Sequence, residues 1–400
     1  MAVTAAEALA VVEEVISGGN YSVAPMAEED FMFVPTHKEF ANLRTQFASS
    51  SWGGVRLDYN VIIRFLFCLL LPLVGCTNQQ KETPKWSEDT YMVSCDSVSV
   101  YPYLLQSTFF LKEGSLVMID PMNVGKICIL DLQTNQMTHY SMTDSLKGIN
   151  PALFPFSIYH SGRYYYYRME DGRLKITGQS LRFRGETATK AVQLNKNNYV
   201  TLGYFRRLLG LYNKKSEELE FYGHYPLSVQ IPFDGIAKSR ITQSFQGEIA
   251  YSEQHSKIVY CSYRFAYMSC YKFTGRKLKF EWEHHLIPPP EVSIVDGLLK
   301  RDAISPHGGF SDVVMAGDYI FASYWQSNLT DSNSGVKNNI LVYSMKGDHI
   351  ATYNIDHQLY VIAVDLEEKT IYGILHKDDT VGFAPFIPVI VRLRFDNHTI

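Results

Sequence analysis

Beyond residue 85, short runs of aromatic and β-branched residues alternate with polar turns rich in Gly, Asn, Asp and Lys. This alternation is typical of β-strands joined by hairpins. No apolar stripe with the spacing of a helix face extends over a useful length in this part of the chain. The region is therefore predicted to be all-β. Its clearest predicted strands are residues 115–119, 126–132, 164–168, 209–212, 257–263, 319–324, 340–343, 370–375 and 388–395.

A loose repeat of strand, polar turn and strand recurs along the same region. Its turns are residues 133–135, 170–172, 213–215, 274–276 and 346–348. After the last repeat, residues 390–395 form one more strand that resembles the strand before the turn in each repeat. Counting it, six units are present. A four-stranded blade takes about 40–50 residues, and the spacing of the units is shorter in one case and longer in others. The longer spacings are expected to contain loop insertions at residues 225–240 and 288–309.

These six units predict a six-bladed β-propeller, in which each blade covers the flat faces of its neighbours. A strand at residues 92–101 would close the ring by joining the last blade. The alternative is a pair of β-sandwiches, which would show strands without the repeated turn motif.

A short apolar segment precedes the β-rich region. Arg64 is followed by the uncharged run from Phe65 to Val74, then by Gly75 and Cys76, and then by polar residues. A basic flank, a short apolar core and small residues at a cleavage site are the features of an export signal. The run is too short to span a bilayer, which takes about 20 apolar residues. The alternative is a buried strand or helix that ends in a turn.

The residues Leu73-Val74-Gly75-Cys76 resemble the lipobox of bacterial lipoproteins. The resemblance implies cleavage before Cys76, diacylglycerol on its thiol, and a lipid-anchored protein in the cell envelope, facing the periplasm or the cell surface. Because export signals lie at the N-terminus, either translation starts later than residue 1 or the first part is a foreign addition. The predicted parts are an N-terminal extension (1–60), the signal segment (61–76), a tether (77–90) and the propeller domain (91–400).

The N-terminal extension carries two patterns of its own. Thr4 and Glu7 form a capping-box pattern before a short amphipathic helix. From residue 29 to 56 the chain resembles the middle of a phage-type DNA-binding domain related to the KilA-N family, through Asp30-Phe31-Met32-Phe33 and Ser50-Ser51-Trp52-Gly53-Gly54. This truncated fragment is too short to bury a core and lacks a basic recognition surface. We therefore expect no nucleic-acid partner.

Composition narrows the functional classes. The 400-residue chain has a formal net charge of −4, which gives no general affinity for nucleic acid or anionic lipid. Its 27 Tyr and 23 Phe favour pleated sheets and aromatic-lined binding faces. The 6 cysteines include no CxxC pair, so no zinc site is predicted. Cys261 and Cys270 would either meet across a hairpin or remain two separate buried thiols.

Common catalytic motifs are absent from the sequence. It contains no GxSxG elbow, HExxH, P-loop, GxGxxG or EF-hand pattern, so no cofactor is predicted. Glu283-His284-His285 contains metal-binding residue types, but neighbouring residues on a strand point to opposite faces, so no metal site is predicted. A glycosidase pair of carboxylates stays open, because the about 5–10 Å separation it needs cannot be read from a sequence.

A ligand site on a propeller is expected at the mouth of the central channel, where several blades meet. Arg pairs with carboxylates in a planar, bidentate manner, and Tyr and Trp offer stacking surfaces for sugars or peptides. The alternative for these residues is structural, with the tyrosines packed between blades and the arginine a charge on the rim. The candidate ligand-binding residues are Tyr263, Arg264, Asp312, Tyr324, Trp325 and Lys337.

The lipobox, the polar tether and the aromatic-rich sixfold repeat together resemble the TolB-like six-bladed propeller lipoproteins of Bacteroidetes, a group largely of unknown function. Residues 308–327 are the most family-like piece. A Gly-Phe turn is expected to enter a strand there, with Asp312 and Asp318 at its flanks.

Our leading hypothesis is a membrane-tethered propeller that binds a glycan, peptide or protein partner without catalysis. The alternative is a lipid-anchored polysaccharide hydrolase or lyase, which should gather two carboxylates, or a His and a carboxylate, in one pocket. A third reading, a cytoplasmic DNA-binding regulator, would need a complete basic domain, which this chain lacks.

Overall fold

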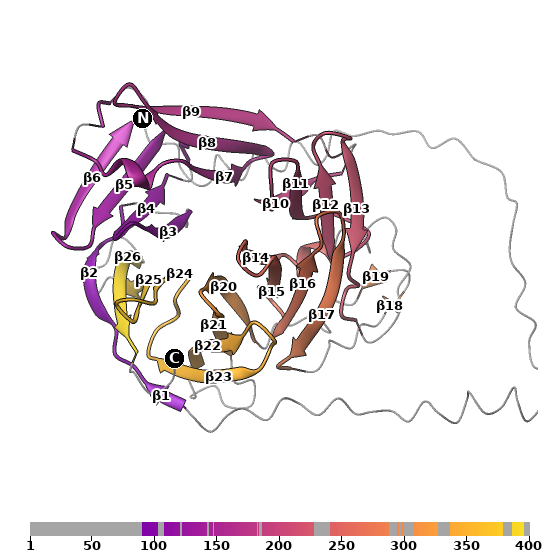
Figure 1. Cartoon of the computed structure of the whole chain (residues 1–400). Helices are drawn as coiled ribbons and strands as arrows, with labels where there is room; N and C mark the ends of the chain where they lie inside the picture. Colours follow the sequence, from indigo (N-terminus) through magenta and orange to yellow (C-terminus); the bar gives the residue numbers. More distant parts are fainter. Residues whose placement is uncertain are drawn as a thin grey trace, which may run out of the picture. The chain divides into compact units, whose positions relative to one another are not determined.

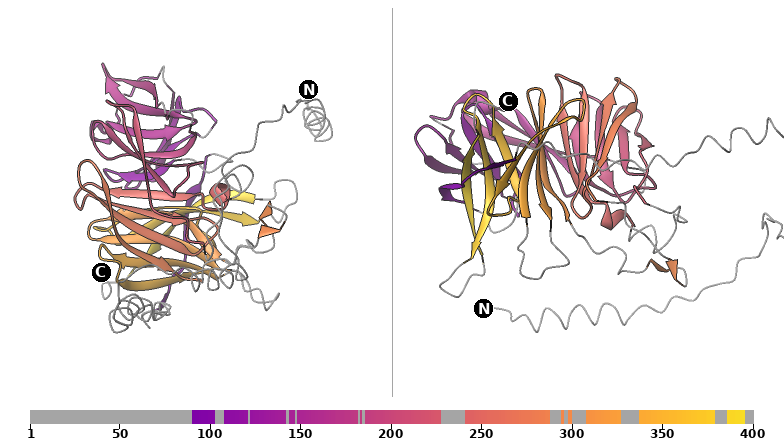
Figure 2. Two further views of the ribbon diagram at one scale, coloured as in Figure 1. Left: turned by 90° about the vertical axis from the view of Figure 1, so that its right-hand side faces the viewer. Right: turned by 90° about the horizontal axis from the view of Figure 1, so that it is seen from below.

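Small antiparallel sheets stand around a central axis, and the described part of the chain forms the predicted six-bladed β-propeller (Figure 1). Figure 2 shows the blades side by side around the ring from two further directions. The predicted N-terminal extension, the signal segment with Cys76 and residues 77–89 of the tether lie outside the described residues. The computed structural model describes residues 90–102, 108–120, 122–141, 144–146, 148–181, 183, 186–227, 241–287, 294–295, 298–299, 308–326, 337–378 and 386–395.

Within each blade the strands follow one another from the channel outward (Figure 1). The first blade contains β3 (Phe109–Lys112), β4 (Ser115–Ile119), β5 (Lys126–Asp131) and β6 (Gln136–Ser141). The second blade contains β7 (Phe156–His160), β8 (Arg163–Glu170) and β9 (Arg173–Ser180), preceded by the 3-10 helix η1 (Pro151–Leu153). The third blade contains β10 (Ala188–Gln193), β11 (Asn198–Gly203), β12 (Leu209–Asn213) and β13 (Glu218–Tyr222).

The remaining blades repeat this order. The fourth blade contains β14 (Gly247–Ser252), β15 (Lys257–Ser262), β16 (Tyr267–Phe273) and β17 (Leu278–His285). The fifth blade contains β20 (Gly308–Ala316), β21 (Tyr319–Gln326), β22 (Lys337–Ser344) and β23 (His349–Ile355). The sixth blade contains β24 (Val361–Asp365), β25 (Thr370–Asp378) and β26 (Phe386–Arg394).

The N-terminal strands close the ring. β2 (Asp96–Val100) pairs antiparallel with β26, so the sixth blade takes its outer strand from the start of the domain. In Figure 1 purple β2 lies beside yellow β26. The predicted closure is thus confirmed, but the single predicted strand is wrong. The structure has two strands instead of one. β1 (Thr90–Met92) ends at Met92 and pairs in parallel with β23 of the fifth blade.

The predicted hairpins are confirmed, and each of the predicted turns joins two consecutive strands of one blade. Gly275 and Gly347 have φ angles of +85° and +93°. L side chains rarely adopt this left-handed region, which is why glycine stands at these turns.

One predicted loop boundary is wrong. Gly308 and Gly309 lie in β20, whereas the sequence placed them in a loop insertion that ended in a Gly-Phe turn. Gly309 has a packing reason to be glycine, because an added Cβ would lie 2.1 Å from the carbonyl oxygen of Tyr263. The insertion itself contains a small hairpin, β18 (Ile294–Val295) with β19 (Leu298–Leu299).

The core lies between the blades, and each central strand contributes to two parts of it. On β15, Ile258 and Tyr260 pack against the third blade, while Val259 and Cys261 pack against the fifth. Successive side chains on a strand point to opposite faces. A strand that is buried on both faces therefore has a continuous apolar run, which is the pattern that the sequence shows.

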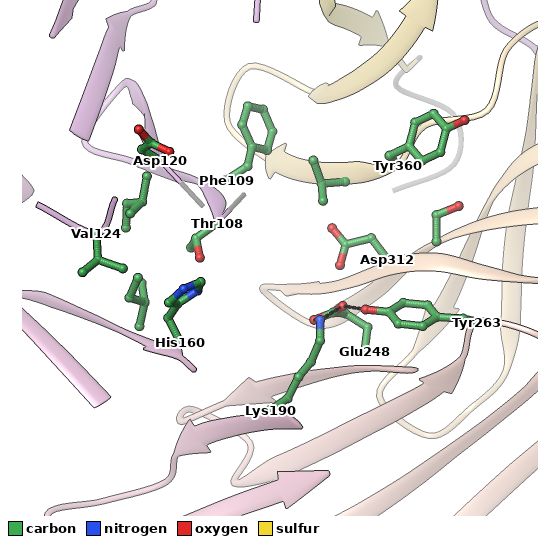
Figure 3. Close-up of a pocket in the computed structure, with 14 residues that line it drawn as sticks. Thr108, Phe109, Asp120, Val124, His160, Lys190, Glu248, Tyr263, Asp312 and Tyr360 are labelled. Carbon is green, nitrogen blue, oxygen red and sulfur yellow. Dashed lines mark hydrogen bonds and ion pairs between the residues drawn. The ribbon is translucent and has the colours of Figure 1, made fainter. Parts of the chain in front are cut away.

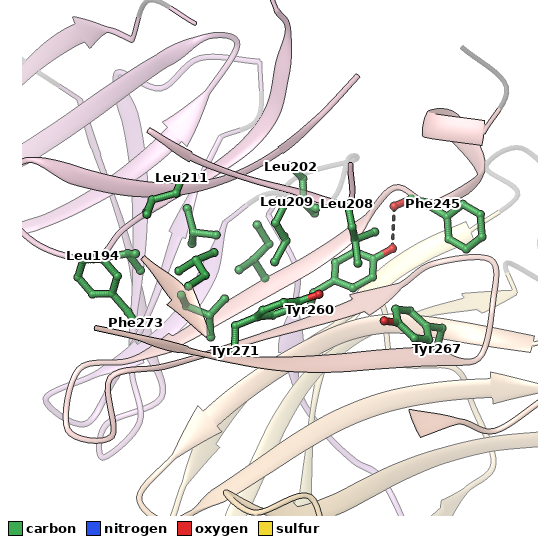
Figure 4. Close-up of a cluster of buried hydrophobic side chains, with 14 of the residues drawn as sticks. Leu194, Leu202, Leu208, Leu209, Leu211, Phe245, Tyr260, Tyr267, Tyr271 and Phe273 are labelled. Atoms are coloured by element: carbon green, nitrogen blue, oxygen red, sulfur yellow. Dashed lines mark hydrogen bonds between the residues drawn. The ribbon is translucent and has the colours of Figure 1, made fainter. Parts of the chain in front are cut away.

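Figure 4 shows the interface between the third and fourth blades. Leu209 and Leu211 of β12 meet Tyr260 and Tyr271 of the fourth blade, and all four side chains are buried. The Tyr260 hydroxyl donates a 2.7 Å hydrogen bond to the carbonyl oxygen of Phe245. The polar end of this buried ring is therefore satisfied, as burial requires.

The thiols of Cys261 and Cys270 are free and buried. In the β15–β16 register Cys261 lies opposite Met268, and Cys270 lies opposite Val259. The two cysteines are therefore not cross-strand partners, and the alternative of two separate buried thiols is confirmed. Cys128 is also free and buried, and Cys95 is free and half-buried.

We predict that deleting residues 1–101 destabilises the propeller far more than deleting residues 1–89. The longer deletion removes β1 and β2, together with buried Tyr101, whose N–H donates to Pro388. Each large apolar side chain lost from the core costs about 1.5–3 kcal/mol. Thermal unfolding followed by circular dichroism measures the difference. Equal melting temperatures for the two deletions would contradict ring closure by β2.

A candidate ligand site in the central channel

A cavity of about 420 Å³ lies in the central channel, and every blade contributes to its wall (Figure 3). Most of its lining residues belong to the innermost strands or lie directly beside them. The lining residues are Thr108, Phe109, Ile119, Asp120, Val124, Ile158, His160, Lys190, Glu248, Tyr263, Ser311, Asp312, Tyr360 and Val361.

One wall of the cavity carries an ion pair between two blades. The ammonium group of Lys190, on β10, contacts both carboxylate oxygens of Glu248, on β14. The Tyr263 hydroxyl donates a hydrogen bond to Oε2 of the same carboxylate. The Lys190 nitrogen also lies 5.4 Å from the centre of the Tyr263 ring. Glu248 is thereby held in one orientation by a cation and a hydroxyl donor.

Burial, followed by the negative charge of Glu248, raises the pKa of Tyr263 well above its usual value. The hydroxyl therefore keeps its proton at neutral pH and remains a donor. The Tyr263 backbone packs closely against Gly309, where a Cβ would clash with the Tyr263 carbonyl oxygen.

Asp312 lies on the same side of the cavity, on β20, and is almost fully buried. Its Oδ1 accepts the N–H of Val313 and its Oδ2 accepts the N–H of Ile362, each at 2.8 Å. The second bond connects the fifth blade to the sixth. Burial, and next the charge of Glu248, raise the pKa of Asp312 to about 8. The cavity thus contains an ion-paired Glu248 beside an Asp312 whose pKa is raised by burial and by the charge of Glu248.

Two β-bulges turn side chains into the cavity. The register of β20 against β21 shifts between Phe310 and Asp312, so both Ser311 and Asp312 line the cavity although they are neighbours. A second shift, between Ala188 and Lys190, lies on β10. Bulges re-aim side chains and often lie beside functional sites.

The facing wall is formed by the first two blades. Thr108 and His160 point into the cavity across from Lys190 and Glu248 (Figure 3). Asp120 lies beyond them and accepts the N–H of Met122 through Oδ1 at 2.8 Å. Between the polar groups, Phe109 and Ile158 give the wall apolar patches.

The structure brings two of the six candidate residues, Tyr263 and Asp312, to this cavity. Tyr324 instead lies in the core between the fourth and fifth blades, 5.3 Å from the Phe310 ring, and burial raises its pKa to about 12. This placement matches the structural alternative. Arg264 is exposed beside Tyr263 and is not among the lining residues.

The other two candidates lie on the fifth blade. Trp325, on β21, is half-buried and pairs in register with Gly309, outside the cavity lining. Lys337 begins β22, and its side chain lies outside the described residues.

Sequence reasoning missed Lys190 and Glu248. Each is a charged residue inside a short strand of small and apolar residues, ATKAVQ and GEIAYS respectively. A lone charge in such a strand is a usable signal, since an unpaired charge is costly to bury. The pairing itself was not visible, because the two strands belong to different blades.

His284 and His285 point to opposite faces of β17, as expected from the strand geometry. His284 Nε2 lies 2.7 Å from the carbonyl oxygen of Gly347, and its ring stacks on Tyr343. His285 instead packs against Tyr267. No cluster of three or more His, Cys, Asp or Glu residues suited to a metal ion occurs in the described part of the chain. Within the same residues, no helix is long and apolar enough to cross a membrane.

No protein-family model matches the chain, and no curated protein matches its sequence. Solved structures do resemble it. A calcium-binding protein, regucalcin, from Agrobacterium tumefaciens is 12% identical with a TM-score of 0.43, covering 77% of this chain and 95% of its own. A candidate exported protein from Bacteroides fragilis is 10% identical with a TM-score of 0.43, covering 77% and 99%. A luciferin-regenerating enzyme is 10% identical with a TM-score of 0.41, covering 76% and 96%. These are likenesses of fold.

We predict that Asp312 makes the protein less stable as the pH rises from about 4 to about 8. Its pKa is about 8 in the folded state against an ordinary value of 3.8, so the folded state binds the proton more strongly across this window. The free energy of unfolding should fall by up to about 1.4 kcal/mol per pH unit from this group.

Asp312→Asn should remove that slope, and urea unfolding between pH 4 and 9 measures it. Asp171→Asn, in the exposed β8–β9 turn, is the matched control and should keep the wild-type slope. Parallel curves for wild type and Asp312→Asn would show that the Asp312 pKa is unshifted.

Proposed function

We propose that this protein is an exported, lipid-anchored propeller whose central cavity binds the end of a glycan without catalysis. The proposed export and lipid anchoring rest on the apolar run before Cys76. The proposed binding role rests on the cavity. The cavity volume of about 420 Å³ falls within the about 300–1,000 Å³ of small-ligand sites.

The lining fits a ligand that carries many hydroxyl groups. A hydroxyl donates one hydrogen bond and accepts up to two, so its binding site should offer donors and acceptors side by side. Here the Lys190 ammonium group has a third N–H to donate, the Tyr263 and Glu248 oxygens can accept, and Thr108 and Ser311 can act as either. The apolar side chains of Phe109 and Ile158 also line the cavity and can contact the C–H faces of a sugar ring.

The observation that carries the proposal is the hydrogen-bonded group Lys190–Glu248–Tyr263. Its members hold one another before any ligand arrives, which reduces the entropy lost on binding. The same contacts disfavour catalysis by these groups. Both oxygens of Glu248 already contact Lys190, and both oxygens of Asp312 already accept backbone N–H groups.

A polysaccharide hydrolase is the second candidate, and one observation favours it. Glu248 and Asp312 place two carboxyl groups in one cavity, which is the arrangement expected of that alternative. The raised pKa of Asp312 suits a general acid, and the ion-paired Glu248 would be the base or nucleophile. Carboxyl pairs whose pKa values are pushed apart are typical of such enzymes.

We predict that the protein binds at least one neutral oligosaccharide from a panel of different linkages, measured by isothermal titration calorimetry. Tyr263→Phe removes one acceptor and the hydroxyl that holds Glu248, and it should weaken binding about three- to tenfold. Glu248→Gln should weaken binding at least about tenfold. Glu170→Gln, on the exposed β8–β9 turn, should have no effect.

An assay for new reducing ends, made on the same samples after titration, separates the two candidates. Binding without new reducing ends supports a binding protein. Cleavage that is lost in both Glu248→Gln and Asp312→Asn would establish the hydrolase. Binding that is unchanged in both cavity variants would overturn the proposed site.

The lipid anchor makes a separate prediction. In a bacterial host the mature protein should begin at Cys76 and carry diacylglycerol on its thiol, as read by mass spectrometry of the N-terminal peptide. Cys76→Ser should move the protein out of the membrane fraction. A mature chain that keeps Met1 and carries no fatty acid would contradict the anchor.

A further inference from the structure

The second blade has three strands within the described residues, whereas every other blade has four or five. Its third strand, β9, forms the outer edge of the blade (Figure 1). β9 pairs with β8 on one side. On its other side the described chain makes one contact, at the start of the strand, where Ser145 forms a bridge to Arg173. The rest of this edge, residues 174–180, has no partner strand in the described part of the chain.

The turn before β9 decides which of its backbone groups face outward. Both residues of the turn 171–172 have positive φ angles, 51° and 70°, as in a two-residue type I′ hairpin turn. Such a turn closes on a hydrogen-bonded pair, here Glu170 and Arg173, and bonded pairs alternate along an antiparallel ladder. The Gly172 carbonyl oxygen fits this alternation, since it accepts the N–H of Leu146 on the outer side. The residues whose N–H and C=O groups point away from β8 are therefore Leu174, Ile176, Gly178 and Ser180.

This edge is open to another strand. No described segment hydrogen-bonds to the outward backbone groups of Ile176, Gly178 and Ser180. Thr177, Gly178 and Ser180 are exposed, so a ligand can reach the backbone here. β9 contains no proline, and its register against β8 has no bulge. An unpaired row of N–H and C=O groups is a template for a further strand.

One face of the β8–β9 hairpin is apolar. Tyr165, Met169 and Ile176 are partly buried there and pack against the core between the first and second blades. A strand added beside β9 would continue this face. Because successive side chains of a strand alternate between faces, every second side chain of the added strand should be apolar.

The other face carries an excess of cations. Arg168, Arg173 and Lys175 are exposed, and Arg168 lies directly opposite Lys175 in the ladder. Glu170 contacts Lys175 and lies 4.0 Å from Arg168. Arg173 forms no ion pair with the described residues. Like charges directly opposite each other destabilise a sheet, and opposite charges stabilise it. The side chains of an added strand on this face should therefore be acidic.

We propose that the edge of β9 binds an extended segment of a partner protein in which apolar and acidic residues alternate. The segment completes the second blade as an antiparallel fourth strand, the place that β6, β13 and β17 take in their own blades. In such strand addition, main-chain hydrogen bonds give affinity and alternate side chains give specificity.

Charge decides between this partner and a second copy of the chain. A second β9 would bring further cations to an edge that already has an excess of them, whereas an acidic segment neutralises it. The edge shares no residue with the channel cavity. Failure of the glycan proposal would leave this one standing, and the reverse also holds.

The test measures binding of fluorescent eight-residue peptides to the full chain by fluorescence anisotropy. Val alternates with Glu in the acidic probe and with Lys in the basic probe. The acidic probe should bind about tenfold more tightly. Arg173→Glu should remove most of that preference. Lys277→Glu, in the exposed β16–β17 turn of the fourth blade, is the matched control and should keep it.

Two N-methylated versions of the acidic probe test which side of the peptide pairs. Residues that exchange hydrogen bonds across an antiparallel ladder lie directly opposite each other, so the Val amides would face Ile176 and Gly178, and the Glu amides would face solvent. Methylation of the Val amides should therefore abolish binding, whereas methylation of the Glu amides should preserve it.

Three results would overturn the proposal. They are no binding of the acidic probe, equal binding of the acidic and basic probes, and equal binding of the two methylated probes. Sedimentation velocity adds a fourth. A dimer that is lost in Ile176→Pro, which removes one outward N–H and should melt within a few degrees of wild type, would assign the edge to a second copy instead.

Discussion

The structure depends on one constraint, which is that every blade has two apolar faces and each must be covered. β15 shows this directly, with Ile258 and Tyr260 on one face and Val259 and Cys261 on the other. A row of such sheets leaves an uncovered face at each end, so the row has to close on itself. Burial of apolar area is the main force that stabilises a folded domain, and here it selects a ring.

Closure involves strand pairing as well as packing. The sixth blade is completed by β2, from the start of the domain, so the first and last segments lie in one sheet. β1 extends the fifth blade in the same way, in parallel with β23. Unfolding the sixth blade therefore requires the first and last segments of the domain to separate.

The ring also places polar groups where single sheets could not. Inner strands from all blades meet at the channel, so Lys190, Glu248 and Asp312 come together from three different blades. A charge in such a place has to be paired or neutral. The Lys190–Glu248 ion pair meets the first condition, and burial raises the pKa of Asp312 toward the second. The cavity is therefore polar and preformed at once.

Local patterns predicted the fold well, because blades are made of hairpins whose turns and apolar runs are continuous in sequence. The closing strand was also visible, but its division into β1 and β2 was not, since nothing local distinguishes the two partners. The channel site was harder. Asp312 and Tyr263 stood out by residue type, yet Tyr324 and Trp325 belong to the same class and lie elsewhere. Bulges and contacts between blades decide the difference.

A double-mutant cycle on Lys190→Met and Glu248→Gln, measured by urea unfolding, tests most directly whether the ring brings separate blades into one site. The account predicts a coupling free energy above about 0.5 kcal/mol, as for residues in contact. Strictly additive effects of the two substitutions would contradict it.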